Sequence, residues 1–394
     1  MSAQVTHHPL RNGLLLIMMV TGAFVLALSL AHARQDEIDF NRARQIRQRF
    51  LRGDQLSVEE QAYLERAKAA FQKKQAGAIK GFRLVGKDSL GLTPLTDLTG
   101  EAQYKGQDGG LYGGGKNEPP DKHFQAAIRI ASRIQPVDSE GKPSSKGKIV
   151  LISVGMSNTT QEFRSFMSLA NRDEQKSPLV ALVDGAQGGM EASAWANPER
   201  ARQMGRPDPW SVLEQRLKEA GYSAGQVQVA WIKQARADPA SLGEFPRHAQ
   251  ELRDNMAVIV RKLKQRYPDL RIAYLSSRIY AGYAVTPLNP EPYAYESAFA
   301  VRWLIQDQIG GKSHLNCDPT GVVVEAPYLL WGPYLWADGV KGRRGDDLIW
   351  KREDLAGDGT HPSPSGQRKV AELLLRFFKT DATAKTWFVK QTPR

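Results

Sequence analysis

Cysteine is nearly absent from this chain of 394 residues, which contains only Cys317. A single thiol excludes an internal disulfide, so a fold of this size must be stabilised by its hydrophobic core. Buried cysteine is a common small core residue, and we favour that interpretation of Cys317 over a reactive thiol. His and Cys residues do not cluster at zinc-ligand spacing, and we expect neither a metal nor an organic cofactor.

The sequence also lacks a stripe of basic residues interleaved with aromatic ones. The formal net charge is +12 at pH 7, but Lys and Arg are scattered along the chain. A basic surface can attract nucleic acid, acidic polysaccharide or an anionic membrane. Without a stripe that grips phosphates, a solvated basic exterior is the better interpretation, and we expect no nucleic-acid partner.

Long hydrophobic runs are absent except near the start of the chain. Arg11 precedes an apolar run over residues 14–30, and Ala31-His32-Ala33 follows it. This order is typical of a secretory signal peptide, here residues 1–33. An uncleaved membrane anchor is the alternative, because the run is at the short limit of what spans a bilayer. Either way we expect an exported protein that is periplasmic, secreted, or anchored in a membrane through residues 14–30 and facing outside.

Two segments separate this leader from the main domain. Residues 36–76 show two helical patterns, with a capping box at Ser57-x-x-Glu60, and predict a helical hairpin that serves as a spacer. Residues 83–147 form a lead-in with six glycines between Gly106 and Gly115. These glycines do not follow a strand and open a helix, so they do not predict a phosphate-binding loop. A loop folded over a cleft and a plain surface loop both fit.

From residue 148 to 394 the pattern alternates between short apolar runs and amphipathic helical segments. Such alternation is typical of a parallel sheet that is covered by helices on both faces. We therefore predict a three-layer α/β/α sandwich with a flavodoxin-like sheet, whose site lies at the carboxyl ends of the strands. The predicted strands are 148–154, 178–184, 226–232, 270–277 and 321–329. The predicted helices are 160–172, 210–221, 245–267, 296–311 and 365–380.

Ser157 lies just after the first predicted strand, at the carboxyl edge of the sheet. Thr159-x-x-Glu162 reads as a second capping box, which predicts a helix N-terminus close to this serine. A serine at such a turn is more often a helix cap than a nucleophile. A base elsewhere in the chain is needed to change that interpretation.

Asp358 and His361 supply such a base in a Gly- and Pro-rich loop before the last helix. A nucleophilic serine needs an imidazole to take its proton, and the imidazole needs a carboxylate to fix its tautomer. A carboxylate three residues before a histidine can turn back onto the ring within one loop. Three other histidines follow the leader, and we expect structural roles for them. They are His123 at a helix start, His248 at an exposed helical position and His314 in a loop.

These two blocks resemble the SGNH hydrolases, also called the GDSL esterase superfamily, and most closely its sialate O-acetylesterase-like branch. That branch has Gly-Gln-Ser-Asn at the serine and Asp-Gly-x-His-Pro at the histidine. This chain has Gly155-Met156-Ser157-Asn158 and Asp358-Gly359-Thr360-His361-Pro362. The resemblance covers about residues 148–379 and leaves the N-terminal third unexplained. The α/β-hydrolase fold fits less well, because its elbow needs a glycine where this chain has Thr159.

The resemblance implies roles for particular residues. Ser157 would be the nucleophile, His361 the general base and Asp358 its orienting acid. The oxyanion hole would combine the serine backbone amide, a glycine amide after the second strand and a side-chain amide after the third. Gly188 is our choice for the glycine, with Gly185 and Gly189 as alternatives. Gln234 would be the side-chain donor, although Trp231-Ile232-Lys233-Gln234-Ala235 departs from the branch pattern Trp-x-Gln-Gly-Glu.

The segment between the fifth predicted strand and the Asp-His loop is rich in aromatic residues. Trp331, Tyr334 and Trp336, together with Tyr328, offer flat faces that suit sugar rings, and Arg343 and Arg344 could meet an acidic group. The alternative is a packed loop whose aromatic residues only cover the sheet edge. The first option predicts carbohydrate binding at these residues.

Taken together, these features predict an exported serine esterase that removes O-acyl groups, such as acetyl, from a carbohydrate through an acyl-enzyme. Its partner would be a small-molecule or polysaccharide ester. A non-catalytic glycan-binding or cell-surface module on the same fold is the first alternative. An assembly protein that acts through its N-terminal helical hairpin is the second.

Overall fold

The computed structural model describes residues 38–39, 42–43, 45–46, 49, 55–79, 86–320 and 323–391. The chain divides into two compact units, Met1–Gly81 and Phe82–Arg394, each of which is described by itself. The predicted leader at residues 1–33 lies outside the described residues. Within the described ranges, no helix is both long enough and apolar enough to cross a membrane.

The smaller unit contains helix α3, which spans Val58–Ile79. Its predicted capping box is confirmed: the backbone N–H of Ser57 donates to Glu60 Oε2 at 3.1 Å, and the backbone N–H of Glu60 donates to Ser57 Oγ at 3.2 Å. The Tyr63 hydroxyl bonds the backbone of Asp39 at 3.2 Å. Most of the first helix of the predicted hairpin lies outside the described residues.

The larger unit is built on a five-stranded parallel sheet with the order β4-β3-β5-β6-β7. This is the flavodoxin-like order, in which the first strand pairs with the second and the third. Every strand residue is buried, as expected for a parallel sheet covered on both faces. The strands are β3 Ile149–Gly155, β4 Val180–Val183, β5 Val227–Lys233, β6 Ile272–Ser276 and β7 Tyr328–Trp331.

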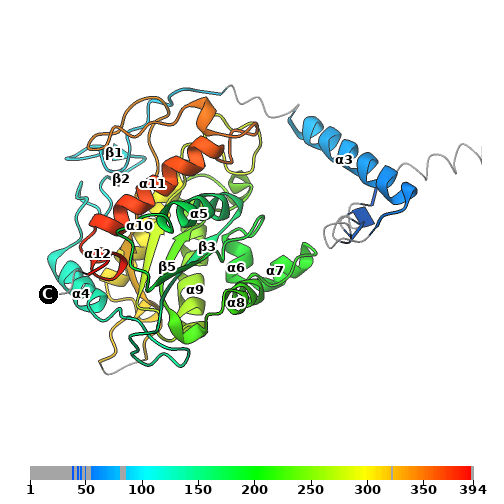
Figure 1. The fold of residues 1–394 in the computed structure, drawn as a ribbon. Coiled ribbons are helices and arrows are strands. Elements are labelled where there is room, and N and C mark those ends of the chain that lie inside the picture. Colours follow the sequence, from blue (N-terminus) through cyan, green and yellow to red (C-terminus); the bar gives the residue numbers. More distant parts are fainter. Residues whose placement is uncertain are drawn as a thin grey trace, which may run out of the picture. The chain divides into compact units, whose positions relative to one another are not determined.

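Helices cover both faces of this sheet and complete the predicted three-layer α/β/α fold. Helices α5 and α11 pack side by side on one face, and α9 and α10 pack together on the other (Figure 1). Helices α5, α9 and α10 each lie between two parallel strands in the chain, as crossover connections do, and α11 follows the last strand. The larger helices are α4 Asp121–Ala131, α5 Ser157–Ala170, α8 Pro209–Glu219, α9 Arg247–Arg266, α10 Tyr293–Ile309 and α11 Pro364–Thr380. The short ones are α6 Ala192–Ala196, α7 Pro198–Gln203 and α12 Lys385–Phe388.

The last strand begins later than the sequence predicts. Of the predicted strand 321–329, only its last two residues belong to β7, and Val323 is 76% exposed. Asn316 keeps this apolar stretch in a loop: its side-chain amide donates to the Val323 carbonyl at 2.9 Å, and its carbonyl accepts from the Glu325 N–H at 2.8 Å. β-branched residues favour strands only where a neighbouring strand can pair with them.

The glycine-rich lead-in packs against α10 and β7. It contains a two-residue hairpin, β1 Gln103–Tyr104 with β2 Gln107–Asp108. Gln306 on α10 donates to the Tyr112 carbonyl at 2.9 Å, and Trp331 on β7 donates to the Leu111 carbonyl at 2.7 Å. A Cβ atom on Gly109 would lie 1.7 Å from the Leu98 carbonyl oxygen, so a larger residue could not make this close approach.

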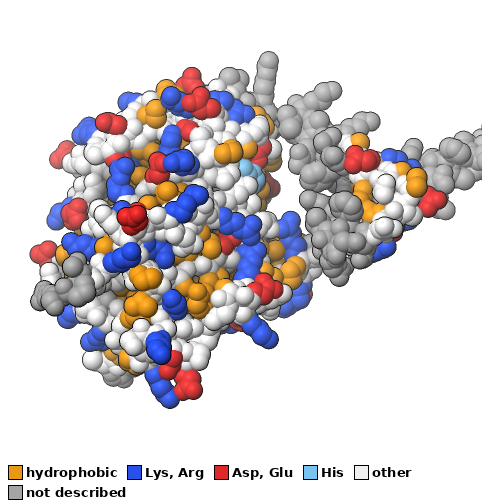
Figure 2. All heavy atoms as spheres, viewed as in Figure 1, with side chains coloured by type: hydrophobic (Ala, Val, Ile, Leu, Met, Phe, Trp, Pro, Cys, Tyr) orange, Lys and Arg blue, Asp and Glu red, His pale blue; other side chains and the backbone are white. Residues whose placement is uncertain are grey.

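The visible face of the larger unit has no single basic stripe. Figure 2 shows Lys and Arg side chains spread over this face, with Asp and Glu among them. This distribution matches the scattered basic residues of the sequence.

Candidate active site

The turn between β3 and α5 presents Ser157 at the carboxyl edge of the sheet. Met156 precedes the helix in an extended conformation, and Ser157 is the first residue of α5. A Cβ atom on Gly155 would lie 2.4 Å from the Lys233 carbonyl oxygen, so only glycine fits where β3 meets β5. The backbone N–H groups of the first helical turn have no partner within the helix, and they form the positive end of the helix dipole.

The predicted capping box at Thr159 and Glu162 is wrong. The helix starts three residues earlier than that motif requires, and the Thr159 hydroxyl donates to the Lys233 carbonyl at 2.8 Å. Glu162 instead accepts two hydrogen bonds of 2.6 Å from the Lys233 ammonium group. Both side chains therefore join α5 to the end of β5 rather than closing the helix start.

The Asp-His loop turns its carboxylate back onto its imidazole. Gly359 makes this turn with φ +64°, and a Cβ atom there would lie 1.8 Å from the Tyr283 carbonyl oxygen. Asp358 Oδ2 lies 2.5 Å from His361 Nδ1. Asp358 Oδ1 accepts from the backbone N–H groups of Thr360 and His361, each at 3.0 Å.

These hydrogen bonds determine the charge of Asp358 and the tautomer of His361. Burial alone would raise the pKa of Asp358, but the bonds from His361 and from two backbone N–H groups lower it to about 2. An ionised carboxylate can only accept, so Nδ1 of His361 carries the proton and Nε2 has a free lone pair. The Ser157 hydroxyl lies 2.6 Å from this Nε2 and donates to it. The structure therefore brings the three predicted triad residues together in one chain of hydrogen bonds.

The loop after β4 brings one of its three candidate glycines against Ser157. A Cβ atom on Gly188 would lie 4.0 Å from the Ser157 Cβ. Gly185 is buried, and a Cβ atom there would lie 2.5 Å from the Ser153 carbonyl oxygen. Gly189 faces the guanidinium group of Arg206. Of the three, Gly188 is therefore placed beside the serine.

Asp184 ties this loop to the serine helix, and sequence reasoning missed it. Its carboxylate accepts from Ser153 on β3 at 2.8 Å and from Arg164 on α5 at 2.8 Å. The backbone N–H of Gln187 also donates to the Gly155 carbonyl at 3.1 Å. A carboxylate directly after a strand, at the same sheet edge as Ser157, was the signal that could have identified it.

Gln234 lies at the same sheet edge, immediately after β5. Lys233 is paired with Gly155 across the two strands, so Gln234 follows the strand that neighbours the Ser157 turn. Its side chain is 1% exposed. Within the described part of the chain, neither its amide nitrogen nor its amide oxygen makes a hydrogen bond. A buried amide without a partner is costly and rare, which makes Gln234 a candidate ligand-binding donor.

The aromatic residues of the predicted sugar site are buried. Trp331, Tyr334 and Trp336 are 5%, 4% and 0% exposed. Each polar end is already used: Trp331 and Trp336 donate to Leu111 and Glu291, and the Tyr334 hydroxyl accepts from Leu95. The prediction that they present flat faces to a sugar is therefore wrong, because they pack the loop against the core.

Two other histidines are buried in structural networks. His248, predicted to be exposed, is 4% exposed and lies 2.7 Å from Glu296, because its helix face packs against α10. His123 lies in the first turn of α4 as expected and bonds the Leu329 carbonyl at 3.0 Å. Among the histidines in the described ranges, only His361 contacts Ser157.

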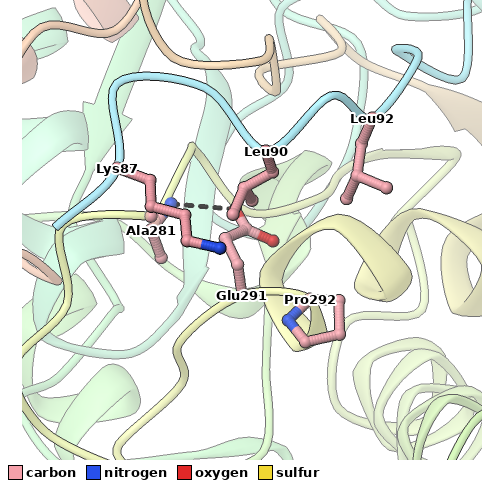
Figure 3. Close-up of a pocket in the computed structure, with 7 residues that line it drawn as sticks. Lys87, Leu90, Leu92, Ala281, Glu291 and Pro292 are labelled. Carbon is pink, nitrogen blue, oxygen red and sulfur yellow. Dashed lines mark hydrogen bonds between the residues drawn. The ribbon is translucent and has the colours of Figure 1, made fainter. Parts of the chain in front are cut away.

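A separate cavity of about 280 Å³ contains none of the triad residues. Figure 3 shows the Glu291 side chain at this cavity. Burial raises the pKa of Glu291 to about 7, against hydrogen bonds from Trp336 and two backbone N–H groups. These bonds hold the start of α10, so we assign Glu291 a structural role. The cavity is lined by Lys87, Leu90, Leu92, Ala281, Gly282, Glu291 and Pro292.

In the described residues, no group of three His, Cys, Asp or Glu side chains could hold a metal ion.

Comparisons with known proteins add little to this picture. No family model matches the chain, and no curated protein matches it. Among solved structures, it is similar to the crystal structure of the lipase Lip_vut3 from a goat rumen metagenome, with 16% identity and a TM-score of 0.29. That match covers 60% of this chain and 100% of the lipase chain. A likeness this low carries no argument, so the fold assignment rests on the sheet topology and the site on its geometry.

Proposed function

We propose that this protein is a serine esterase of the SGNH type, which hydrolyses an O-acyl ester through an acyl-enzyme. The observation that carries this proposal is the hydrogen-bonded chain from Ser157 Oγ to His361 Nε2, at 2.6 Å, and from His361 Nδ1 to Asp358 Oδ2, at 2.5 Å. Nucleophile, base and orienting acid are thus in contact and in the order that acyl transfer requires.

In the acylation step, Ser157 Oγ attacks the ester carbonyl while its proton moves to Nε2 of His361. Asp358 remains ionised and stabilises the imidazolium that forms. The tetrahedral intermediate then collapses, the bond to the leaving alcohol breaks, and Nε2 returns its proton to that alcohol. Ser157 is left as an acyl ester.

The negative charge on the carbonyl oxygen needs donors during this step. The Ser157 N–H at the start of α5, the Gly188 N–H and the Gln234 amide are the groups we propose. Such donors act most strongly when they are fixed before the substrate arrives and have no other partner. The place of Gln234 directly after β5, beside the Ser157 turn, and its amide without a partner among the described residues support this role.

Deacylation repeats the chemistry with water as the nucleophile. His361 takes a proton from water, the hydroxide attacks the acyl carbonyl, and Ser157 leaves with the proton from Nε2. The His361 and Asp358 side chains are 24% and 31% exposed, which supports access of water to the base.

The proposal also covers the class of substrate and the location of the enzyme. The sequence resemblance supports an O-acyl group on a carbohydrate, and the expected leader at residues 1–33 supports an exported enzyme. The aromatic residues at 331, 334 and 336 add no support, because they are buried. A glycan-binding module without catalysis is distinguished by the experiment below.

Hydrolysis of p-nitrophenyl acetate by Ser157→Ala tests the proposal. We expect kcat/KM to fall at least about a thousandfold relative to the wild type, because the nucleophile is lost. Ser365→Ala is a matched control: this serine lies four residues after His361, bonds the Glu353 carbonyl and touches no triad residue. Full activity in Ser157→Ala would refute the mechanism, and an inactive wild type would favour the binding module.

A further inference from the structure

Arg278 lies beneath the Asp-His loop and has no role in the chemistry described so far. It follows β6 and is 1% exposed. Its guanidinium group donates to the Thr360 carbonyl at 3.3 Å. The peptide that carries this carbonyl also carries the His361 N–H, which donates to Asp358 at 3.0 Å. One peptide group is therefore held between the guanidinium group and the catalytic carboxylate.

The backbone of Arg278 is fixed as well. Its N–H donates to the Ser297 hydroxyl on α10 at 3.2 Å, and Ser297 donates in turn to the Ala294 carbonyl at 2.6 Å. The next residues support the same loop, because the Val285 N–H donates to the Asp358 carbonyl at 3.0 Å. Arg278 is thus anchored to the scaffold at one end and to the Asp-His loop at the other.

A buried ion pair joins the helix that carries Ser157 to the strand that precedes Gln234. The Lys233 ammonium group lies 2.6 Å from both carboxylate oxygens of Glu162, and both side chains are 0% exposed. Glu162 lies on α5 with Ser157, and Lys233 ends β5 immediately before Gln234. This pair therefore fixes the serine helix against the strand that carries the proposed oxyanion donor.

The guanidinium group of Arg278 interacts electrostatically with three carboxylates around the Asp-His loop. Burial lowers its pKa, whereas Glu162, Glu291 and Asp358 act to raise it. Burial lowers the pKa of Lys233 to about 8, against the attraction of Glu162. Arg278 therefore brings a buried positive charge to a region that contains three carboxylates.

We infer that Arg278 is a positioning residue that holds the Asp-His loop in register with Ser157 and places a buried positive charge against the peptide group that precedes His361. This inference rests on the proposed esterase function. Several charged groups lie around the loop. They are Asp358 itself, Arg352 and Asp354 before it, Lys369 on α11, Arg278 after β6, Glu291 before α10, Glu162 on α5 and Lys233 at the end of β5.

Replacing Arg278 by Met tests both parts of the role. We expect kcat/KM for p-nitrophenyl acetate to fall by up to about 100-fold, the loss that a small misplacement of a catalytic group can cause. The loss of a positive charge also favours protonated imidazole, which cannot act as a base. The acid limb of the pH profile of kcat/KM therefore moves to higher pH.

Arg278→Lys distinguishes the positioning role of Arg278 from the effect of its positive charge. It keeps the charge but loses the planar guanidinium fork, so we expect kcat to fall about tenfold with the acid limb unmoved. It also serves as the test if Arg278→Met does not fold. Unchanged kcat in Arg278→Lys would overturn the positioning role.

Arg302→Met is the matched control for lost stability. Arg302 is also 1% exposed and donates to the Asp108 carbonyl, in contact with the glycine-rich lead-in. Its replacement is expected to lower the melting temperature and leave the acid limb in place. An unmoved limb in Arg278→Met, or an equal shift in Arg302→Met, would contradict the inference. An inactive wild type would instead reject the proposed function itself.

Discussion

The two halves of the candidate site differ in how their polar groups are satisfied. Ser157, His361 and Asp358 bond one another, and Asp358 accepts two further backbone N–H groups. On the other half, the Gln234 amide is buried and makes no hydrogen bond to the described protein. Donors that bind a reaction intermediate must not be used up in the free enzyme. The polar groups of the first half are therefore satisfied by one another, whereas the amide of the second half has no partner among the described residues.

This difference also appears in what supports each half. The triad loop depends on the tight turn at Gly359, on local bonds of Asp358, and on the support of Arg278 and Val285. Gln234 depends on the pairing of β3 with β5 and on the buried pair of Lys233 and Glu162. Substitution of Asp358 is therefore expected to lower the stability of the protein, whereas substitution of Gln234 is expected to lower activity without lowering stability.

Removing the base gives the largest expected effect among substitutions that leave Ser157 intact. In His361→Gln, the glutamine cannot take the serine proton, so kcat/KM for p-nitrophenyl acetate should fall by about three orders of magnitude or more. His314→Gln is the control, because His314 is exposed in a short helical turn. Comparable losses in both variants would show that the base lies elsewhere.

Replacing the unpaired amide should lower activity without lowering stability. In Gln234→Leu we expect kcat to fall about a hundredfold, the loss of roughly 3 kcal/mol that follows removal of one oxyanion donor. The free energy of unfolding should stay equal or rise, because no hydrogen bond within the described protein is lost. Enzyme assays and urea unfolding measure the two quantities.

Gln228 on β5, the strand that Gln234 follows, provides the matched control. It is 0% exposed, but its amide bonds both the carbonyl and the N–H of Gln135, at 2.7 Å and 3.3 Å. Gln228→Leu leaves those two groups unpaired and should cost about 1–3 kcal/mol of stability with activity retained. If Gln234→Leu behaves like Gln228→Leu, the Gln234 amide is structural.

The smallest expected effect is a change of stability with pH. The folded pKa of Asp358 is about 2, below its ordinary value of 3.8. A depressed pKa contributes stability above the unfolded value, and this contribution is lost as the pH falls from about 4 to 2. Because the Asp358 side chain is 31% exposed and solvent screens its interactions, Asp358→Asn should be less stable than the wild type by about 1 kcal/mol at pH 7. The difference measured by urea unfolding should shrink below pH 4, and a constant difference would contradict the pKa assignment.

The sequence predicts the layers of the fold and the first four strands well, because each is a short apolar run between amphipathic helices. The fifth is misplaced, since the valines near residue 323 look like a strand while Asn316 keeps them in a loop. The triad was accessible from sequence because a carboxylate three residues before a histidine is a local pattern.

Contacts between distant segments could not be predicted from the sequence in the same way. Glu162 pairs with Lys233, 71 residues away, and Arg278 reaches Thr360, 82 residues away. The burial of Trp331, Tyr334 and Trp336 likewise depends on partners such as Leu95, Leu111 and Glu291 from other parts of the chain. Periodicity shows that such residues are apolar or charged, but it does not show what covers them.

Covalent labelling by a fluorophosphonate probe tests the central claim most directly, because the probe reacts only with a serine that is activated by its neighbours. The modified residue is identified by mass spectrometry of the purified wild type, Ser157→Ala and His361→Gln. The account predicts one label on Ser157 in the wild type, none in Ser157→Ala and strongly slowed labelling in His361→Gln. Labelling of a different residue, or ester hydrolysis by a protein that the probe does not modify at Ser157, would contradict it.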